Sequence, residues 1–361
     1  MADTIKFIRI GIIGCGALGI VHAQRLSALP GIQICAVSDP DDAAMRRVAD
    51  VLPEITPVEF YSDYRDMLAN ANLTAVCINS PNRWHVEQLL ASLDRKLHVL
   101  CEKPLSMVPA EVEQVVEATK AAGTTVAIAY QSRYRRDSRI LRRALQSGAY
   151  GKVTSIDVFS CEDWITPNRG TWRHDPDRCP GGFFADANGH QLDLLFWLTG
   201  LRPLELRATI ENRGTPVPMV TWGEARLGDG EAPLPDRSDR SDEGMVAGTC
   251  PLSEGVPFTF TFVGDARHWG EDIHIQTEKA DFVMRDTKLL WSDGTQGLGP
   301  FPDPPGEPAP SELGDTPDGA FIAALRGGPP VVSPPHTVWP VLRFTLAALE
   351  SARRGEPVRC D

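Results

Sequence analysis

The sequence predicts an α/β protein with two domains, a doubly wound parallel sheet over residues 1–130 and an α+β domain over residues 131–361. Three observations predict this division. A chain of 361 residues is longer than one hydrophobic core usually accommodates. Short apolar runs alternate with helical patterns through the first part, as in βαβ units. In the second part, Phe258, Phe260 and Phe262 alternate with threonines, which indicates an antiparallel strand with one apolar face.

In the first domain, each apolar run predicts a strand and each stretch with helical periodicity predicts the helix that follows it. The expected strands are 8–13, 33–38, 57–60, 74–78, 97–101 and 124–129. The expected helices are 17–29, 41–51, 63–69, 83–93 and 109–122. Asp63 is expected to cap the third of these helices. Ligands of such sheets bind outside the carboxyl ends of the strands, so the residues just after each strand are the first candidates for a site.

The second domain has a different pattern. Its expected strands include 153–160, 271–276, 280–285 and 287–291, and its expected helices are 188–199, 316–326 and 337–353. Residues 212–245 mix glycine, proline and charged residues, which predicts a long loop. Six prolines within 300–310 predict an extended segment there.

A glycine motif stands where the first predicted strand meets the first helix. The run Ile8–Ile13 leads into Gly14, Gly16 and Gly19, in the spacing G-x-G-x-x-G. Gly14 permits a sharp turn, Gly16 lets a pyrophosphate approach the backbone, and Gly19 allows close packing of helix on strand. A turn of this kind also occurs without a nucleotide, but here the second strand ends on Asp39, 20 residues after Gly19. This pattern predicts a Rossmann domain.

Asp39 also indicates which dinucleotide binds. Its carboxylate suits the two hydroxyls of an adenosine ribose, and its charge would repel a 2′-phosphate. Pro40 follows it, where an arginine, lysine or serine would favour that phosphate. We therefore expect NAD rather than NADP.

Two further segments carry candidate catalytic groups. Lys103, in Glu102-Lys103-Pro104, follows the strand 97–101, where an ammonium group would stabilise alkoxide charge during hydride transfer; a solvated surface lysine is the alternative. Asp186, His190 and Asp193 have spacings that place all three on one helix face. A histidine beside a carboxylate suits a general base, although a structural histidine or a metal ligand would give the same pattern, and no third metal ligand is evident.

Composition limits the partners and the compartment. A formal net charge of −12 opposes binding to nucleic acid or to an anionic membrane surface. No stretch is long enough to span a membrane, and the N-terminal apolar run is expected to be a strand rather than a signal peptide. The eight cysteines show neither a C-x-x-C pair nor zinc spacing, which favours a reducing, cytoplasmic environment.

Taken together and in order, these motifs resemble the glucose–fructose oxidoreductase / inositol dehydrogenase / MocA (Gfo/Idh/MocA) family. They are Gly14-x-Gly16-x-x-Gly19, Ser80-Pro81-Asn82 with His85, Glu102-Lys103-Pro104, Trp172-Arg173, Gly181-Gly182 and Asp186-x-x-x-His190-x-x-Asp193. The resemblance covers nearly the whole chain. It implies a Rossmann domain, a C-terminal domain with a large open-faced, mainly antiparallel sheet, a bound nicotinamide dinucleotide, and a sugar or cyclic polyol as substrate.

The resemblance also implies roles for individual residues. Lys103 matches the catalytic lysine, and Asp186 with His190 matches a pair whose histidine is the usual proton acceptor. The expected cofactor-binding residues are Gly14, Cys15, Gly16, Ala17, Leu18, Gly19, Asp39, Ser80, Pro81, Asn82, His85, Glu102, Lys103, Gln131, Trp172 and Arg173. Phe183 and the pair Asn188-Gly189 depart from the family pattern, which leaves the substrate open.

Three functions are compatible with the sequence. The first is an NAD-dependent dehydrogenase acting on a secondary hydroxyl of a sugar or cyclitol. The second is an NAD-dependent glycosidase or lyase that oxidises the sugar only transiently, and the third is a non-catalytic NAD-binding regulator, against which the presence of both Lys103 and His190 argues. We also expect a homo-oligomer, a dimer or tetramer, formed through an apolar sheet face that includes Phe258, Phe260 and Phe262. The alternative is that the long loops cover this face within one chain.

Overall fold

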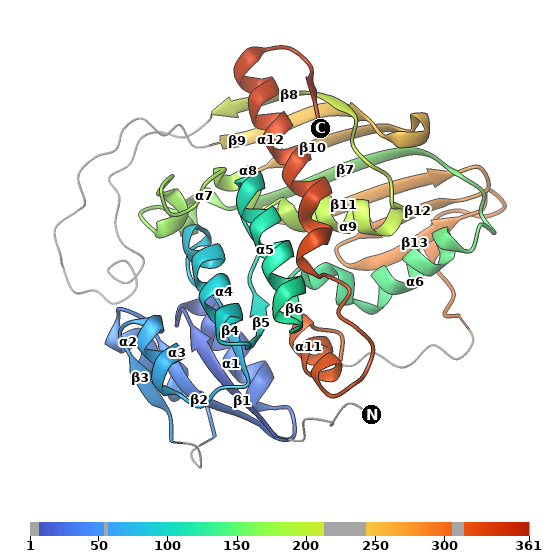
Figure 1. Cartoon of the computed structure of the whole chain (residues 1–361). Helices are drawn as coiled ribbons and strands as arrows, with labels where there is room; N and C mark the ends of the chain where they lie inside the picture. The colour runs from blue at the N-terminus through green and yellow to red at the C-terminus, as the bar shows by residue number, and fades with distance from the viewer. Residues whose placement is uncertain (1–6, 54–56, 213–242, 305–313, 361) are drawn as a thin grey trace. The chain divides into compact units, whose positions relative to one another are not determined.

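The computed structural model describes residues 7–53, 57–212, 243–304 and 314–360 (Figure 1). Most of the predicted loop 212–245, and part of the proline-rich segment 300–310, lie outside the described residues. The chain forms two compact units. One comprises Met1–Tyr134 and Ala309–Val338, and the other comprises Arg135–Pro308 and Trp339–Asp361. The first unit therefore includes a segment, 309–338, that the sequence-based division assigned to the second domain.

The first unit contains a six-stranded sheet in the order β3-β2-β1-β4-β5-β6, and all its pairings are parallel. The strands are β1 (Ile8–Ile13), β2 (Ile32–Ser38), β3 (Glu59–Tyr61), β4 (Ala75–Ile78), β5 (His98–Cys101) and β6 (Val126–Ile128). The helices before β6 are α1 (Ala17–Ser27), α2 (Asp42–Ala49), α3 (Tyr64–Asn70), α4 (His85–Asp94) and α5 (Pro109–Ala122), with the short turn η1 (Asn82–Trp84) ahead of α4. Asp63 caps α3 as predicted, since its carboxylate accepts the Arg65 N–H at 2.8 Å. The predicted doubly wound parallel sheet is confirmed.

The helix α11 (Pro317–Leu325) belongs to the first unit because its apolar side chains complete that unit's core. Phe321 and Ile322 are buried in the same cluster as Ile8, Ile10 and Ile12 of β1. The chain then runs beside β6, where the Ile128 N–H donates to the Ser333 carbonyl at 2.9 Å. A segment from near the C-terminus thus becomes part of the N-terminal sheet domain.

The second unit is built on a nine-stranded sheet in the order β14-β13-β12-β11-β7-β10-β9-β8-β15. Its strands are β7 (Val153–Asp163), β8 (Glu205–Asn212), β9 (Glu243–Pro251), β10 (Pro257–Val263), β11 (Asp265–Thr277), β12 (Asp281–Arg285), β13 (Lys288–Ser292), β14 (Gly299–Pro300) and β15 (Val358–Arg359). Of its pairings, that of β7 with β10 is parallel and the others are antiparallel. The predicted mainly antiparallel sheet is confirmed.

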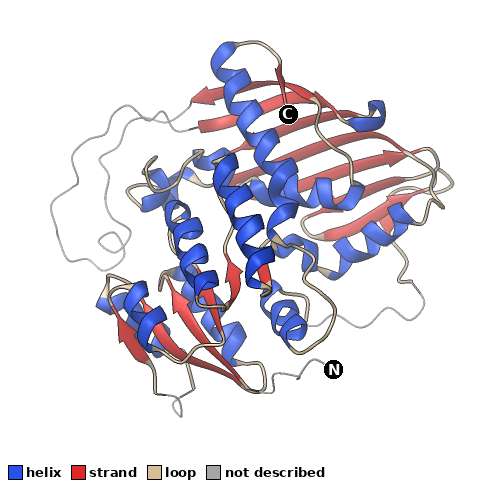
Figure 2. Cartoon of the chain, in the orientation of Figure 1, coloured by secondary structure: helices blue, strands red, loops and turns tan. Residues whose placement is uncertain are grey.

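Helices pack on one face of this sheet, as the view coloured by secondary structure makes visible (Figure 2). They are α6 (Arg136–Gln146), α8 (Gly182–Asp186), α9 (Gly189–Thr199) and α12 (Trp339–Arg354), while α7 (Ile165–Asn168) and the turn η3 (Trp172–His174) lie in the connection from β7 to α8. Phe258, Phe260 and Phe262 are each at most 2% exposed. The ring of Phe344, on α12, lies 5.1 Å from that of Phe260, and Phe184, on α8, lies 5.7 Å from Phe262.

The expectation that this phenylalanine stripe forms an oligomer interface is therefore wrong. The stripe is apolar because it contacts helices of its own unit, above all α12, which returns from far along the chain. On the opposite face of the sheet, Phe159 is 45% exposed. Any interface formed by this sheet involves different residues from those the sequence indicated.

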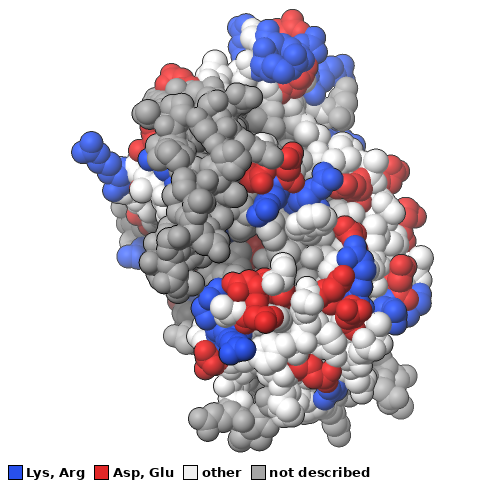
Figure 3. Space-filling view, turned by 90° about the vertical axis from the view of Figure 1, so that its left-hand side faces the viewer, with Lys and Arg blue, Asp and Glu red and all other residues white. Residues whose placement is uncertain are grey.

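The described surface carries charged side chains of both signs. Figure 3 shows acidic and basic side chains interspersed over the described part of one face, without a broad basic surface there. None of the helices in the described ranges is long and apolar enough to cross a membrane.

Candidate active site

The glycine turn between β1 and α1 has the geometry that a bound pyrophosphate requires. Gly14 has φ +86°, and a Cβ there would lie 2.5 Å from the Ser80 nitrogen. A Cβ at Gly19 would lie 2.2 Å from the Gly14 carbonyl oxygen, so both positions exclude any larger residue. Gly16, by contrast, faces open space and is exposed, as is Ala17, while Leu18 is half-buried. The start of α1 carries no acidic residue in its first turn, so its N–H groups are suited to an anion.

Asp39, at the end of β2, holds this turn in place. Its Oδ2 accepts the Cys15 N–H at 2.8 Å, and its Oδ1 accepts the Asp41 N–H at 2.9 Å. A carboxylate has about four acceptor positions, so lone pairs remain for the hydroxyls of a ribose. Burial, and next the charge of Asp39, raise the pKa of the Cys15 thiol, which keeps it protonated. The residues present therefore fit the adenosine and pyrophosphate parts of NAD.

A second group of predicted residues follows β4. Ser80 and Asn82 are buried, and Pro81 between them is half-buried. The Ser80 hydroxyl donates to Gln88 of α4 at 2.6 Å. His85 is fully buried, with Nε2 2.8 Å from the Ser80 carbonyl oxygen and Nδ1 2.8 Å from that of Pro104. Burial lowers the pKa of His85. This imidazole connects the segment after β4 to the segment after β5.

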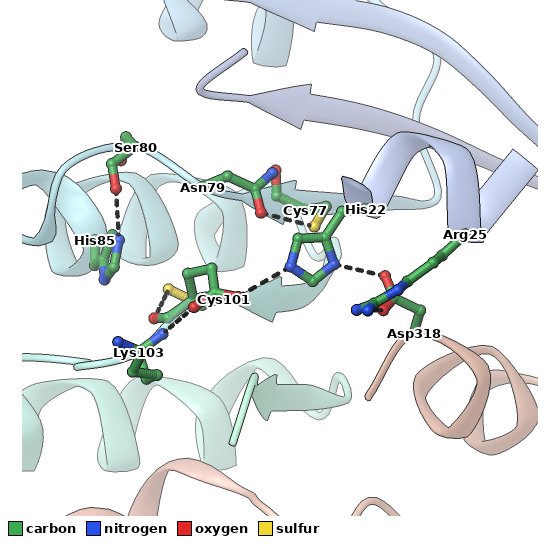
Figure 4. A network of polar contacts seen from close by, with 10 residues as sticks. His22, Arg25, Cys77, Asn79, Ser80, His85, Cys101, Lys103 and Asp318 are labelled. Atoms are coloured by element: carbon green, nitrogen blue, oxygen red, sulfur yellow. Dashed lines mark hydrogen bonds and ion pairs between the residues drawn. The ribbon is translucent and has the colours of Figure 1, made fainter. Parts of the chain in front are cut away.

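Lys103 lies directly beyond β5 and is half-buried. Its backbone N–H donates to Oε2 of Glu102 at 3.0 Å. The other oxygen of Glu102 lies 3.0 Å from Nε2 of His22 on α1. Nδ1 of His22 lies 2.6 Å from Oδ1 of Asp318 on α11, and Arg25 is 3.6 Å from the second Asp318 oxygen (Figure 4). The last predicted residue of this unit, Gln131, begins the turn η2 (Gln131–Tyr134) after β6.

His22 and Asp318 are not among the residues predicted from the sequence. His22 had one available signal, because it is a polar residue on the buried face of α1, in line with Gly19, Ala23 and Leu26. Asp318 has no such signal, because acidic residues are common in the first turn of solvent-exposed helices.

The second unit contains the other predicted catalytic residues. Asp186 ends α8 and is 4% exposed. Its Oδ2 accepts from Arg173 Nε at 3.0 Å and from the Trp164 indole N–H at 3.3 Å. The Arg173 guanidinium lies 4.4 Å from the centre of the Trp172 ring. His190 is half-buried in the first turn of α9. The structure thus brings Trp172, Arg173 and Asp186 into one cluster, and Asp186 lies four residues before His190 in the sequence.

Lys103 belongs to the first unit, and Asp186 and His190 belong to the second. Their joint action is therefore a prediction. In the ranges that the structure describes, no group of three or more His, Cys, Asp or Glu side chains is arranged to hold a metal ion.

Comparison with known proteins gives the family. Residues 8–130 match the model of an oxidoreductase family with an NAD-binding Rossmann fold, and residues 138–282 match the C-terminal domain of Gfo/Idh/MocA proteins. The chain belongs to the Gfo/Idh/MocA family. The predicted resemblance is confirmed, and with it the NAD-binding Rossmann domain.

Individual relatives match this chain over only part of their length. Myo-inositol 2-dehydrogenase of Thermotoga maritima is 29% identical over 193 residues, which cover 54% of this chain and 55% of that protein. D-glucoside 3-dehydrogenase of Escherichia coli is 26% identical over 200 residues, 55% of this chain and 56% of that protein. These matches span little more than half the length of the relatives. Among solved structures, levoglucosan dehydrogenase in complex with NADH superposes with a TM-score of 0.80 at 18% identity, covering 98% of this chain and 99% of that one, which shows a shared fold.

Proposed function

We propose that the protein is a dehydrogenase that transfers hydride between NAD and a secondary hydroxyl of a sugar, a cyclitol or a derivative of one. The observation that carries this proposal is Lys103, placed just beyond β5 in the same NAD-binding unit as the glycine turn and Asp39. Ligands of such sheets bind at this edge. The names of the relatives, which include inositol and glucoside dehydrogenases, support the substrate class.

The cofactor is expected to bind along the carboxyl edge of the parallel sheet. The turn from Gly14 to Gly19 would receive the pyrophosphate, and Asp39 the adenosine ribose. Ser80, Asn82 and Glu102 follow neighbouring strands, β4 and β5, and are expected to line the path toward the nicotinamide. When bound, the nicotinamide supplies the hydride acceptor.

The chain's own residues would handle the proton and the charge. Oxidation of a hydroxyl requires a group that takes its proton and a cation that stabilises the developing alkoxide. We assign the first task to His190 and the second to Lys103. Asp186, whose charge is matched by Arg173, would bind substrate hydroxyls or orient His190.

The proposal includes a reducing, cytoplasmic location and a homo-oligomer. All eight cysteines are free and buried, as expected of a protein that is not built on disulfides. Phe159, exposed on the face of β7 that the helices do not cover, supports an interface on the sheet of the second unit. Light scattering at working concentration tests this part, and a monomeric mass would contradict it.

A substrate panel tests the proposed reaction. Cyclitols, free sugars, levoglucosan and aryl glycosides are each incubated with the protein and NAD, and both NADH and released aglycone are measured. We expect NADH to accumulate with at least one sugar or cyclitol. Aglycone release without net NADH would show redox-neutral glycoside cleavage instead. NAD binding without turnover of any compound would favour a regulator.

A further inference from the structure

A buried histidine in the first unit bridges two carboxyl groups that come from distant parts of the chain. His22 Nε2 lies 3.0 Å from Glu102, and Nδ1 lies 2.6 Å from Asp318. The imidazole is 2% exposed, Glu102 is 9% exposed and Asp318 is fully buried. A neutral imidazole has one N–H, whereas two carboxylate partners require two. Burial alone lowers the pKa of His22, but the Cys77 sulfur and the Asp318 carboxylate outweigh burial and raise it.

This bridge continues into the backbone at Lys103. The Glu102 oxygen that His22 does not contact accepts the Lys103 N–H at 3.0 Å. On the other side of Lys103, the Pro104 carbonyl lies 2.8 Å from His85. The residues before and after Lys103 are thus each held by a buried imidazole, one from α1 and one from α4. Figure 4 shows both histidines flanking the segment.

We propose that His22 is a positioning residue for Lys103: anchored by Asp318, it fixes the Glu102 carboxylate, which in turn fixes the Lys103 backbone. The functional part of this inference rests on the proposed role of Lys103. Neither His22 nor Asp318 needs to touch substrate or cofactor. A misplacement of a catalytic group by about 1 Å can reduce turnover by about 10²-fold, so such an anchor affects catalysis from a distance.

Two substitutions at one position separate positioning from simple stabilisation. In His22→Gln, the side-chain amide nitrogen takes the place of Nε2 and keeps a donor toward Glu102. In His22→Asn, the amide nitrogen takes the place of Nδ1 and keeps only the donor toward Asp318. Both remove a buried imidazole and are expected to cost similar stability. Only His22→Asn is expected to release Glu102.

The Lys103 amide provides a readout that does not depend on activity. The sequence contains two Glu-Lys pairs, Glu102-Lys103 and Glu278-Lys279. Labelling glutamate with ¹³C at the carbonyl and lysine with ¹⁵N therefore selects two amides in an NMR spectrum. Lys279 lies in the second unit and serves as an internal reference. His98→Asn is the matched control, because His98 begins the same strand β5 and its contact is made through Nδ1, which accepts the Thr125 N–H at 2.9 Å.

The two His22 variants are expected to differ in amide exchange at Lys103 and in turnover. In His22→Asn, hydrogen exchange at Lys103 accelerates at least 10-fold relative to Lys279, and kcat falls by about 10²-fold with a much smaller change in KM. In His22→Gln and His98→Asn, exchange and kcat stay within about 3-fold of wild type. Equal exchange at Lys103 in all four proteins would overturn the proposal.

Asp318→Asn covers the case in which His22→Asn does not fold. It keeps the shape of the side chain and weakens the anchor, so Lys103 exchange should rise there too; unchanged exchange would contradict the proposal. If the wild type shows no turnover on the substrate panel, the proposed function fails. Because amide exchange needs no substrate, it would still decide whether His22 holds Lys103.

Discussion

Each unit contains a buried carboxyl cluster, and the two clusters are assembled in different ways. In the second unit, the partners of Asp186 are Arg173 and Trp164, which lie 13 and 22 residues away in sequence. In the first unit, His22 is 80 residues from Glu102 and 296 residues from Asp318. A cluster built from neighbouring segments leaves a pattern in the sequence. A cluster closed by a helix from the far end of the chain does not.

The two clusters also differ in access to water. Asp318 is fully buried, and its partner His22 is nearly so. The Arg173 side chain is 24% exposed, so water screens part of its interaction with Asp186. The first cluster is therefore suited to holding backbone rigidly, and the second to meeting a ligand.

The largest effects are expected from the two proposed catalytic residues, Lys103 and His190. Replacing Lys103 by Met, or His190 by Asn, should each reduce turnover by roughly 10²–10⁴-fold, the usual range for a positioned acid–base or electrostatic group. NAD affinity should survive both changes, because the glycine turn and Asp39 are intact. Steady-state rates and an NAD titration check this. Lys120→Met is the control, since that side chain is 67% exposed on α5; full activity of either site variant would remove its residue from the mechanism.

Stability measurements compare the two clusters directly. In Asp318→Ala, the charged His22 stays buried but loses one of its two carboxylate partners. Breaking such a buried pair lowers the free energy of unfolding by about 3–5 kcal/mol. Asp186→Ala should lower the free energy of unfolding by less, about 1–2 kcal/mol, because water then solvates the Arg173 guanidinium. Urea denaturation of both variants measures the difference. A larger loss in Asp186→Ala would mean that the second cluster, not the first, is the structural one.

A third test concerns Asp39, whose contact with Cys15 has a sequence separation between those of the two clusters. Asp39 accepts the Cys15 N–H across 24 residues and is expected to receive the adenosine ribose as well. Asp39→Ala should weaken NAD binding about 10-fold, equivalent to about 1.4 kcal/mol, and reduce the preference over NADP. Isothermal titration with both nucleotides measures each effect. Unchanged discrimination between them would show that another group excludes the 2′-phosphate.

The smallest effect is expected from pH. The charged groups facing His22 are Glu102, Asp318 and Arg25, and the Cys77 thiol lies beside it. Because the folded-state pKa of His22 is raised above 6.5, its stabilisation is fully present below that pH and is lost as pH rises through the raised value. His22→Gln lacks this titration. The stability of wild type should therefore fall more steeply above neutral pH than that of His22→Gln, and parallel curves would place the titrating group elsewhere.

Much of the architecture was predictable because it depends on local patterns. The run Ile8–Ile13, the glycines after it and Asp39 at the end of the next strand are enough to specify a βαβ nucleotide-binding unit. The alternation around Phe260 specifies a strand with one apolar face. The same alternation led to a wrong conclusion about exposure, since a stripe that contacts α12 has the same sequence pattern as a stripe that contacts another subunit.

The sequence by itself determined the family, the parallel and antiparallel sheets, and the candidate residues Lys103, Asp186 and His190, because each of these is encoded within a few neighbouring residues. Only the tertiary structure decided that Phe344 covers the phenylalanine stripe and that α11 returns to the first unit. It alone placed Asp318 against His22, and through Glu102 against the backbone of Lys103. These contacts join positions up to 296 residues apart. The contacts of Asp318 form because burying Phe321 and Ile322 draws α11 onto the N-terminal core, which is a property of the folded chain as a whole.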